Sequence, residues 1–212
     1  MEKISIKRII NGKWEENCYI ISSRSKAIII DPGGNLDAMY SYLQEKNLSL
    51  TAIFNTHAHF DHIVSVSDMK KKYQCDFYLH SNDERLLKSA NLYMKLFEGD
   101  EKIEIPTVDV YLDKINNPII IDGFQINILF TPGHTEGSVC FLIEDLLFTG
   151  DTLLKNTIGR YDLPGANMEK LKQSLIMLSK LNGDFKLYPG HGDPTTLSME
   201  LSFNKRFIEI IR

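Results

Sequence analysis

The chain of 212 residues is 43% hydrophobic and 25% charged, which is typical of a globular protein and excludes a disordered or collagen-like chain. The net charge of -4 offers no basic field to nucleic acid or anionic lipid, so we expect a small-molecule substrate, with no nucleic-acid or membrane partner. The length predicts one domain over residues 1–212. Because the sequence contains neither a secretory signal nor a long apolar run, we expect a cytoplasmic location. The oligomeric state stays open.

The first half of the chain is predicted to combine strands with helices. Short apolar or alternating runs bounded by turn residues indicate strands, and apolar residues three and four apart indicate helices. The stretch over 91–102 is too irregular to assign. The predicted strands cover 4–10, 18–22, 27–30, 50–55 and 77–79, and the predicted helices cover 36–46, 63–73 and 83–90.

The second half is predicted to be mostly strands, with a final segment rich in helices. Two dipeptides, Asp122-Gly123 and Glu144-Asp145, have the composition of hairpin turns. Sheets with helices on both sides in the sequence predict an α/β fold, a four-layer αββα sandwich. The predicted strands cover 108–112, 119–121, 124–130, 138–143, 146–148 and 185–188, and the predicted helices cover 168–181 and 196–211.

The segment from Thr56 to His62 contains three histidines and an aspartate at a predicted junction between a strand and a helix. His57 and His59 are two residues apart at the end of the strand, so their side chains point the same way and can share one metal ion. Asp61 and His62 lie beyond the bend into the helix and face a second position nearby. The spacing therefore predicts two adjacent metals.

Three further candidates each follow a predicted strand in a turn that contains glycine. Imidazole and carboxylate groups suit zinc, manganese or iron, and the lack of cysteine in these turns argues against a closed structural zinc site. One histidine alone is often a surface residue, but the repeated position at strand ends makes chance a poor explanation for the whole set. We predict two divalent metal ions at a catalytic site, with zinc favoured and iron or manganese as alternatives. The predicted ligands are His57, His59, Asp61, His62, His134, Asp151 and His191.

Other residues with reactive side chains are given structural interpretations. Cys18 and Cys140 lie in predicted strands, which favours core packing over covalent catalysis. His80 follows a short strand without a companion ligand and is predicted to be structural. The lysines over 70–72 are interpreted as the solvated end of a helix rather than a nucleic-acid patch.

The motifs quoted above resemble those of the metallo-β-lactamase superfamily, and within it the hydroxyacylglutathione hydrolase (glyoxalase II)-like members. The similarity extends from Ile30-Asp31-Pro32-Gly33 through the His57 segment to Thr131-Pro132-Gly133-His134, Gly150-Asp151-Thr152 and Pro189-Gly190-His191-Gly192. It implies that Asp151 bridges two metals and that Asp31 hydrogen-bonds a ligating histidine rather than merely starting a turn. It implies this division of the other ligands: His57, His59 and His134 on the first metal, and Asp61, His62 and His191 on the second.

The resemblance implies a hydrolase of thioesters of the S-lactoylglutathione type. Two adjacent metals can make hydroxide available near neutral pH, and Asp61 is the predicted catalytic residue that orients it or carries its proton. Where two-metal zinc β-lactamases typically carry a cysteine this chain has Asp151, so a β-lactam substrate is not expected.

The segment over 158–165 is similar to that of short glyoxalase II-like bacterial proteins. Within it, Arg160 either binds a substrate carboxylate or pairs with Asp162 to brace the loop. Full-length glyoxalase II enzymes have a C-terminal helical region that grips glutathione, whereas this chain ends soon after His191, so the thiol carrier stays open. The alternatives are a lactonase or generalist esterase, a mononuclear iron persulfide dioxygenase, and a non-catalytic metal-binding module.

Overall fold

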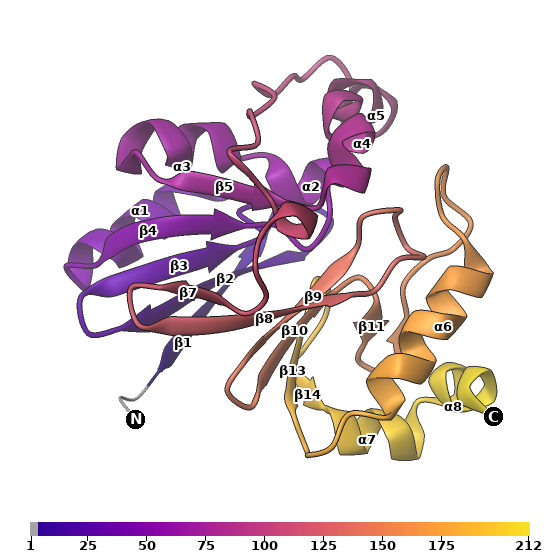
Figure 1. Ribbon diagram of the computed structural model, residues 1–212. Helices are drawn as coiled ribbons and strands as arrows, with labels where there is room; N and C mark the ends of the chain where they lie inside the picture. Colours follow the sequence, from indigo (N-terminus) through magenta and orange to yellow (C-terminus); the bar gives the residue numbers. More distant parts are fainter. Residues whose placement is uncertain (1–3) are drawn as a thin grey trace.

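Two six-stranded sheets pack face to face in the computed structural model, which describes residues 4–212 (Figure 1). The first sheet takes its strands in sequence order from residues 5–111. β1 to β3 are antiparallel neighbours, whereas β3 to β6 run parallel because helices connect them. Its strands are β1 (Ser5–Asn11), β2 (Glu16–Ser23), β3 (Lys26–Ile30), β4 (Ser49–Phe54), β5 (Asp76–Leu79) and β6 (Val110–Tyr111).

The second sheet has the order β14-β13-β10-β9-β8-β7, in which β10 and β13 are parallel and the other pairs antiparallel. A small two-stranded sheet of β11 and β12 lies beside it. The second sheet contains β7 (Ile119–Ile121), β8 (Phe124–Phe130), β9 (Val139–Ile143), β10 (Leu146–Gly150), β13 (Lys186–Pro189) and β14 (Thr195–Thr196), and the small one β11 (Leu153–Leu154) and β12 (Thr157–Ile158).

Helices cover the outer face of each sheet and complete the predicted four-layer αββα sandwich, as Figure 1 shows. Two short 3-10 helices, η1 (Ser81–Asp83) and η2 (Leu112–Lys114), follow β5 and β6. The first sheet is covered by α1 (Leu36–Glu45), α2 (Phe60–Ile63), α3 (Val66–Tyr73), α4 (Glu84–Lys88) and α5 (Ala90–Phe97), and the second by α6 (Met168–Ser179), α7 (Leu197–Phe203) and α8 (Lys205–Ile211).

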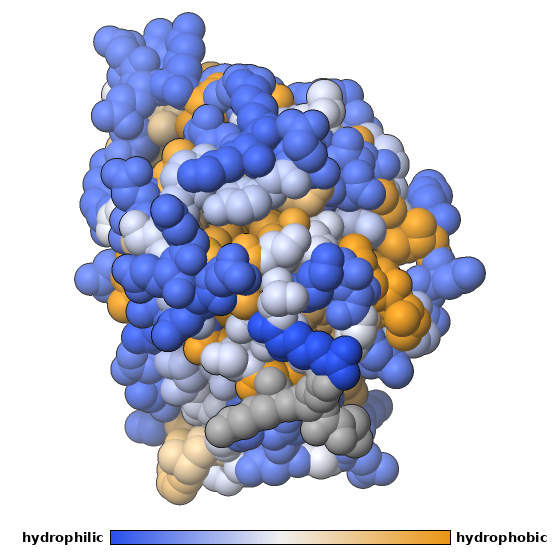
Figure 2. All heavy atoms as spheres, turned by 90° about the vertical axis from the view of Figure 1, so that its left-hand side faces the viewer, coloured by the Kyte–Doolittle hydropathy of each residue, from blue (hydrophilic) through white to orange (hydrophobic). Residues whose placement is uncertain are grey.

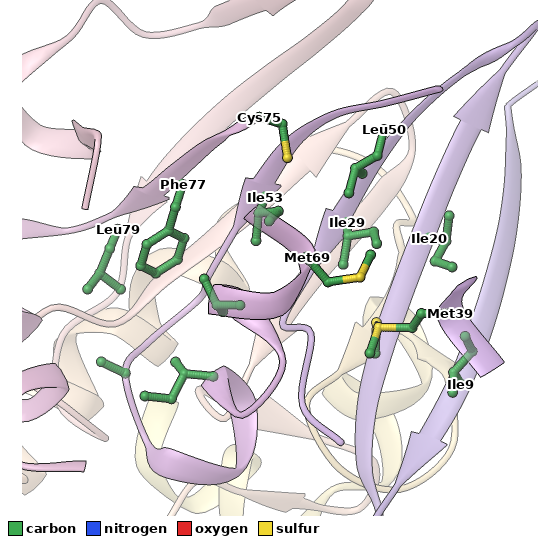
Figure 3. Close-up of a cluster of buried hydrophobic side chains, with 14 of the residues drawn as sticks. Ile9, Ile20, Ile29, Met39, Leu50, Ile53, Met69, Cys75, Phe77 and Leu79 are labelled. Atoms are coloured by element: carbon green, nitrogen blue, oxygen red, sulfur yellow. The ribbon is translucent and has the colours of Figure 1, made fainter. Parts of the chain in front are cut away.

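Three apolar layers separate the four structural layers. Alternate residues of a strand point to opposite faces, so β3 sends Ile29 outward toward α1 and α3 and sends Ile28 and Ile30 inward toward the second sheet. Figure 3 shows the first outer layer, in which Met39 of α1 and Met69 of α3 meet strand side chains. Because both faces of β3 are buried from Ala27 to Ile30, the strand is apolar over these residues, as the sequence indicated.

Two predicted helices are interrupted in the structure. The helix predicted over 63–73 begins only at Val66, as α3, and Ile63 instead ends α2, because the backbone amide of Ser65 donates to the carbonyl of Pro32 at 3.0 Å and leaves the helical ladder. The helix predicted over 196–211 is divided at Asn204, whose side chain caps α8. The unassigned stretch over 91–102 contains most of α5.

The strand predicted over 108–112 is shorter in the structure, where β6 pairs with β5 only through Val110 and Tyr111 before η2 begins. The face in Figure 2 is largely hydrophilic, with apolar side chains visible in patches between polar ones. Within residues 4–212, every helix is too short or too polar to cross a membrane.

Candidate metal centre

The loop between β4 and α2 is held by buried hydrogen bonds before it presents any ligand. The backbone amide and the hydroxyl of Thr56 donate to the two carboxylate oxygens of Asp31, at 2.7 and 2.6 Å. The side-chain amide of Asn55 donates to the carbonyl of His62 at 2.9 Å. These bonds fix both ends of the loop, so the side chains between them are positioned by the backbone.

His57, His59 and His134 form the first group of converging donor atoms. Each offers one ring nitrogen, and these atoms lie within 4.8 Å of one another. His134 Nε2 lies 2.9 Å from His59 Nδ1. The other nitrogen of His134, Nδ1, donates to the carbonyl of Arg160 at 2.8 Å, because a carbonyl only accepts. This bond fixes the tautomer of His134 and leaves Nε2 directed at the other two rings.

His57 is oriented in the same manner. The Thr56 hydroxyl donates its proton to Asp31, so its oxygen accepts from His57 Nδ1 at 3.0 Å. His57 Nε2 is buried, and within residues 4–212 it contacts no hydrogen-bond partner. A buried polar atom without a partner is costly, and an unshared lone pair directed at two other imidazoles is the arrangement that a metal ion would satisfy.

Asp61, His62 and His191 form the second group, again within 4.8 Å of one another. His191 Nε2 lies 3.3 Å from His62 Nε2 and 3.4 Å from Asp61 Oδ2. The opposite nitrogen of His191 donates to the carbonyl of Trp14 at 2.8 Å, and His62 Nδ1 lies 3.2 Å from Asp31 Oδ2. In both histidines, Nε2 therefore faces the group.

Asp151 lies between the two groups. Its Oδ2 is 3.5 Å from His134 Nε2 of the first group and 3.6 Å from His191 Nε2 of the second. Its Oδ1 is buried and, among the described residues, lacks a hydrogen-bond partner. A Cβ atom at position 190 would lie 2.3 Å from this oxygen, so the carboxylate requires Gly190 beside it.

The protonation of the first group and of Asp151 also suits a metal. Burial, together with the neighbouring His134, lowers the pKa of His59 to about 3, and burial lowers that of His57 as well. For Asp151 burial acts in the opposite direction, but His191 and His134 lower its pKa. Neutral imidazoles and an ionised carboxylate are the forms that bind divalent metals.

A third set, Asp31, His57 and His62, also has the spacing of a metal site. Both oxygens of Asp31 already accept hydrogen bonds from Thr56, however. Asp31 therefore has the contacts of a residue that holds ligands in place, and it also adopts a left-handed backbone conformation with φ of 51° at the turn after β3. The structure thus contains the turn considered for Asp31, and its role beside a ligating histidine stays a prediction.

The sequence profile of the Metallo-beta-lactamase superfamily matches residues 11–191 of this chain. The chain belongs to the metallo-β-lactamase superfamily. It is 35% identical over 202 residues to a probable metallo-hydrolase of Bacillus subtilis, covering 93% of this chain and 95% of the relative. It is 33% identical over 200 residues to the hydroxyacylglutathione hydrolase GloC of Haemophilus influenzae, covering 90% of this chain and 92% of that protein.

Solved structures of the superfamily share the fold. A structure described as the BLEG-1 B3 metallo-beta-lactamase superposes with a TM-score of 0.88 at 31% identity, covering 95% of this chain and 98% of the other. A protein described as di-iron-bound superposes with a TM-score of 0.81 at 32% identity, covering 94% and 98%. A likeness to ETHE1 of Myxococcus xanthus, at 24% identity and a TM-score of 0.80 over 98% and 88%, shows the fold alone.

Two buried carboxyl groups beside the centre of this metallo-β-lactamase superfamily chain were missed at the sequence level. Glu16 Oε1 lies 3.7 Å from His62 Nδ1, while Oε2 accepts from Asn11 at 2.6 Å, and burial with Asp31 raises the pKa of Glu16. Asp83 is also buried, and burial raises its pKa to about 6. An acid at the start of an apolar strand was a signal for Glu16, whereas Asp83 has the ordinary sequence context of a helix cap.

Two other candidates lie apart from these groups. The Arg160 guanidinium is exposed and forms two bonds of 3.0 Å to the Asp162 carboxylate, while the Arg160 carbonyl holds His134. The structure thus contains the brace considered for Arg160, and a role in binding substrate stays a prediction. His80 stacks on Phe130 with ring centroids 4.5 Å apart and accepts from the backbone amide of Asn82.

Proposed function

We propose that this chain is a metal-dependent hydrolase of thioesters of the hydroxyacylglutathione type, with two divalent metal ions. The observation that carries the proposal is the pair of adjacent donor groups with Asp151 between them. Membership of the superfamily supports the coarser class of metallo-hydrolase. In our assignment His57, His59 and His134 hold the first metal, Asp61, His62 and His191 hold the second, and Asp151 is shared.

When bound, two such metals supply an acidified water as nucleophile and polarise the substrate carbonyl. The chain provides the remaining functions. Burial acts to raise the pKa of Asp61, but His62 and His191 lower it below its usual range, so this carboxylate is ionised and can accept a hydrogen bond from the attacking water. Asp61 is 3.4 Å from His191 through one oxygen, which fixes its direction.

A cavity of about 160 Å³ lies beside Asp61. Trp14, Phe60 and Met94 provide apolar walls, and Lys13 contributes a polar edge. The rings of Trp14 and Phe60 meet edge to face with centroids 6.3 Å apart, so this wall is packed. A cavity of this size suits an acyl group of a few carbons, such as lactoyl.

Glutathione is proposed as the thiol carrier because the GloC relative is named for that substrate and matches over 92% of its own length. A relative of similar extent thus carries this name. Zinc is the proposed metal, and iron is the alternative that the di-iron-bound relative supports.

The test is release of thiol from S-lactoylglutathione by purified protein, with metal content measured on the same sample. We expect turnover with about two metals per chain, and we expect His59→Ala and Asp61→Ala to lower kcat/KM by at least about 100-fold. Asp37→Ala, on the exposed first turn of α1, is the matched control and should keep wild-type activity. Absence of turnover from metal-loaded protein would contradict the glutathione thioester proposal.

Hydrolysis of β-lactams is a second candidate, favoured by the 31% identity to a structure described as a B3 metallo-beta-lactamase. Asp151, in place of a cysteine, argued against it at the sequence level. A chromogenic cephalosporin assayed beside S-lactoylglutathione separates the two, and we expect kcat/KM to be larger for the thioester. A homoserine lactone, and oxygen uptake on a persulfide with iron-loaded protein, test the remaining alternatives in parallel.

A further inference from the structure

Asp83 ends η1 and precedes the first residue of α4, a position at which aspartate usually caps its own helix. Its side chain is only 1% exposed. Among residues 4–212, the partners of the carboxylate lie outside α4. A buried carboxylate that is not used by its own helix requires another reason for its position.

The carboxylate instead accepts three hydrogen bonds from two loops of the metal centre. Oδ2 accepts from the backbone amide of Ala58 at 3.0 Å and from the Thr135 hydroxyl at 2.8 Å. Oδ1 accepts from the backbone amide of Gly137 at 2.7 Å. Charge-assisted bonds of this length are stronger and more directional than neutral ones. One side chain therefore joins a loop of the first sheet to a loop of the second.

These donors are immediate neighbours of the proposed ligands. Ala58 lies between His57 and His59, and Thr135 follows His134. The loop after β4 belongs to the first sheet, whereas the loop after β8 belongs to the second, so neither sheet by itself fixes the distance between them. Asp83 contacts both loops through backbone amides and one buried hydroxyl. These donors have little freedom to move, so the bonds fix the loops relative to each other.

The atoms around the Asp83 carboxylate are also closely packed. A Cβ atom at position 137 would lie 2.7 Å from Asp83 Cγ and 2.8 Å from its backbone nitrogen, so this approach requires Gly137. Ala58 is completely buried and small. The close packing means that the loops cannot shift without breaking the three bonds to Asp83.

We propose that Asp83 is a positioning residue that holds the His57–His59 loop and the His134 loop in register, so that three imidazoles converge on the first metal. The inference rests on the metal assignment made under the proposed function. It predicts that loss of the carboxylate weakens the first site while the second site, whose ligands are not adjacent in sequence to the groups that donate to Asp83, is largely retained. Removal of a group that orients metal ligands typically costs 10- to 100-fold in metal affinity.

The experiment measures binding of Co²⁺ alone to the full chain, by competition with a chromogenic chelator and by the visible d–d spectrum. Asp83→Asn replaces one accepting oxygen by an NH₂ group that opposes a donor. We expect the affinity of the first site for Co²⁺ to fall by about 10- to 100-fold and the spectrum to change. The affinity of the second site should stay close to that of the wild type.

Asp113→Asn is the matched control for effects on η1. Asp113 accepts from the backbone amide and hydroxyl of Ser81 at 3.1 and 2.9 Å, so it braces the same short helix without contact to either ligand loop. We expect this variant to lose stability but to keep the Co²⁺ affinities and spectrum of the wild type. If Asp83→Asn gives the same result as Asp113→Asn, Asp83 is merely structural and the inference is wrong.

A milder pair of variants decides the matter if Asp83→Asn does not fold. Thr135→Val removes one donor to Asp83, whereas Thr135→Ser keeps it. The inference expects a weaker first Co²⁺ site in Thr135→Val and recovery in Thr135→Ser, and equal affinities in both variants would overturn it.

Because no thioester is used, a wild-type protein that binds two Co²⁺ ions yet lacks thioesterase activity contradicts only the proposed reaction. Wild-type protein that binds no Co²⁺ overturns the metal assignment and this inference together.

Discussion

At the scale of single residues, a neutral histidine that donates from one ring nitrogen to a fixed acceptor keeps a lone pair on the other nitrogen. That lone pair is what a metal ion would bind. His134 and His191 donate from Nδ1 to backbone carbonyls, and His57 donates to the Thr56 hydroxyl. A carbonyl cannot exchange roles with its donor, so the backbone sets the tautomers of His134 and His191, and the bond from the Thr56 hydroxyl to Asp31 sets that of His57. Two backbone carbonyls and one hydroxyl, none of them a proposed metal ligand, therefore orient the imidazoles toward the candidate metal positions.

Thr56 provides a test of this ordering. Its hydroxyl both accepts from His57 Nδ1 and donates to Asp31, so Thr56→Val removes two buried bonds while keeping the shape of the side chain. We expect metal affinity to fall by about 10-fold or more. Thr56→Ser, which keeps the hydroxyl, should retain most of the affinity in the same chelator competition. Equal affinities in the two variants would show that the hydroxyl is unimportant.

The thiols give a second prediction at this scale. Cys18 and Cys140 are completely buried and Cys75 is 8% exposed. Burial raises the pKa of Cys75 to about 11 and that of Cys140 to about 12, so at pH 8 both remain protonated and poorly nucleophilic. Iodoacetamide at pH 8 should label the native protein slowly and the denatured protein fully, as mass spectrometry can follow. Rapid native labelling accompanied by loss of activity would favour a catalytic cysteine.

At the scale of elements, the break between α7 and α8 has a clear origin. Asn204 is buried, its Oδ1 accepts from the amide of Phe207 at 3.1 Å, and its Nδ2 donates to the Thr157 carbonyl at 2.8 Å and to Glu200 at 2.9 Å. One side chain thus starts α8 and ties it to β12. A continuous helix would lose this contact with the small sheet.

Asn204→Ala should therefore destabilise the protein more than an ordinary capping change. It removes the cap and leaves buried partners unsatisfied, which together cost about 3 kcal/mol in the free energy of unfolding. Asn167 caps α6 through a bond of 2.9 Å to the amide of Lys170, but it is exposed. Asn167→Ala should cost only about 1 kcal/mol in urea denaturation, and equal losses for the two variants would contradict the interpretation.

At the scale of the whole molecule, the metal centre lies where loops from both sheets meet. The first sheet supplies the segment from His57 to His62, and the second supplies His134, Asp151 and His191 after β8, β10 and β13. Each sheet alone carries part of either donor group. Correct packing of the sheets is therefore a condition for the site, and metal bound there links the two halves of the sandwich.

Metal binding should for this reason stabilise the folded chain. A ligand that binds the native state at 100 times its Kd adds about 2.7 kcal/mol, which for a domain of this size raises Tm by roughly 5–10 °C. We expect Tm to fall after treatment with a chelator and to recover on addition of Zn²⁺. His59→Ala combined with His134→Ala should lose most of this response, and a Tm independent of metal would contradict the assignment.

The sequence by itself determined the class of fold and indicated which residues would form the candidate centre. Periodicity of apolar residues located most strands, and the repeated position of His57, His134 and His191 at strand ends indicated that they belong to one site. Spacing separated His57 and His59 from Asp61 and His62, and the resemblance assigned His134 and His191. The structure adds that the donor atoms of each group lie within 4.8 Å of one another.

Only the tertiary structure placed Glu16 and Asp83 beside the centre. Glu16 and Asp83 lie far from the ligands in the sequence and are brought to them by packing of strands and loops, which local patterns do not encode. The breaks at Ser65 and Asn204 depend on partners elsewhere in the chain, Pro32 and Thr157. Periodicity reports which face of an element is buried, whereas a hydrogen bond across the molecule depends on where another element lies.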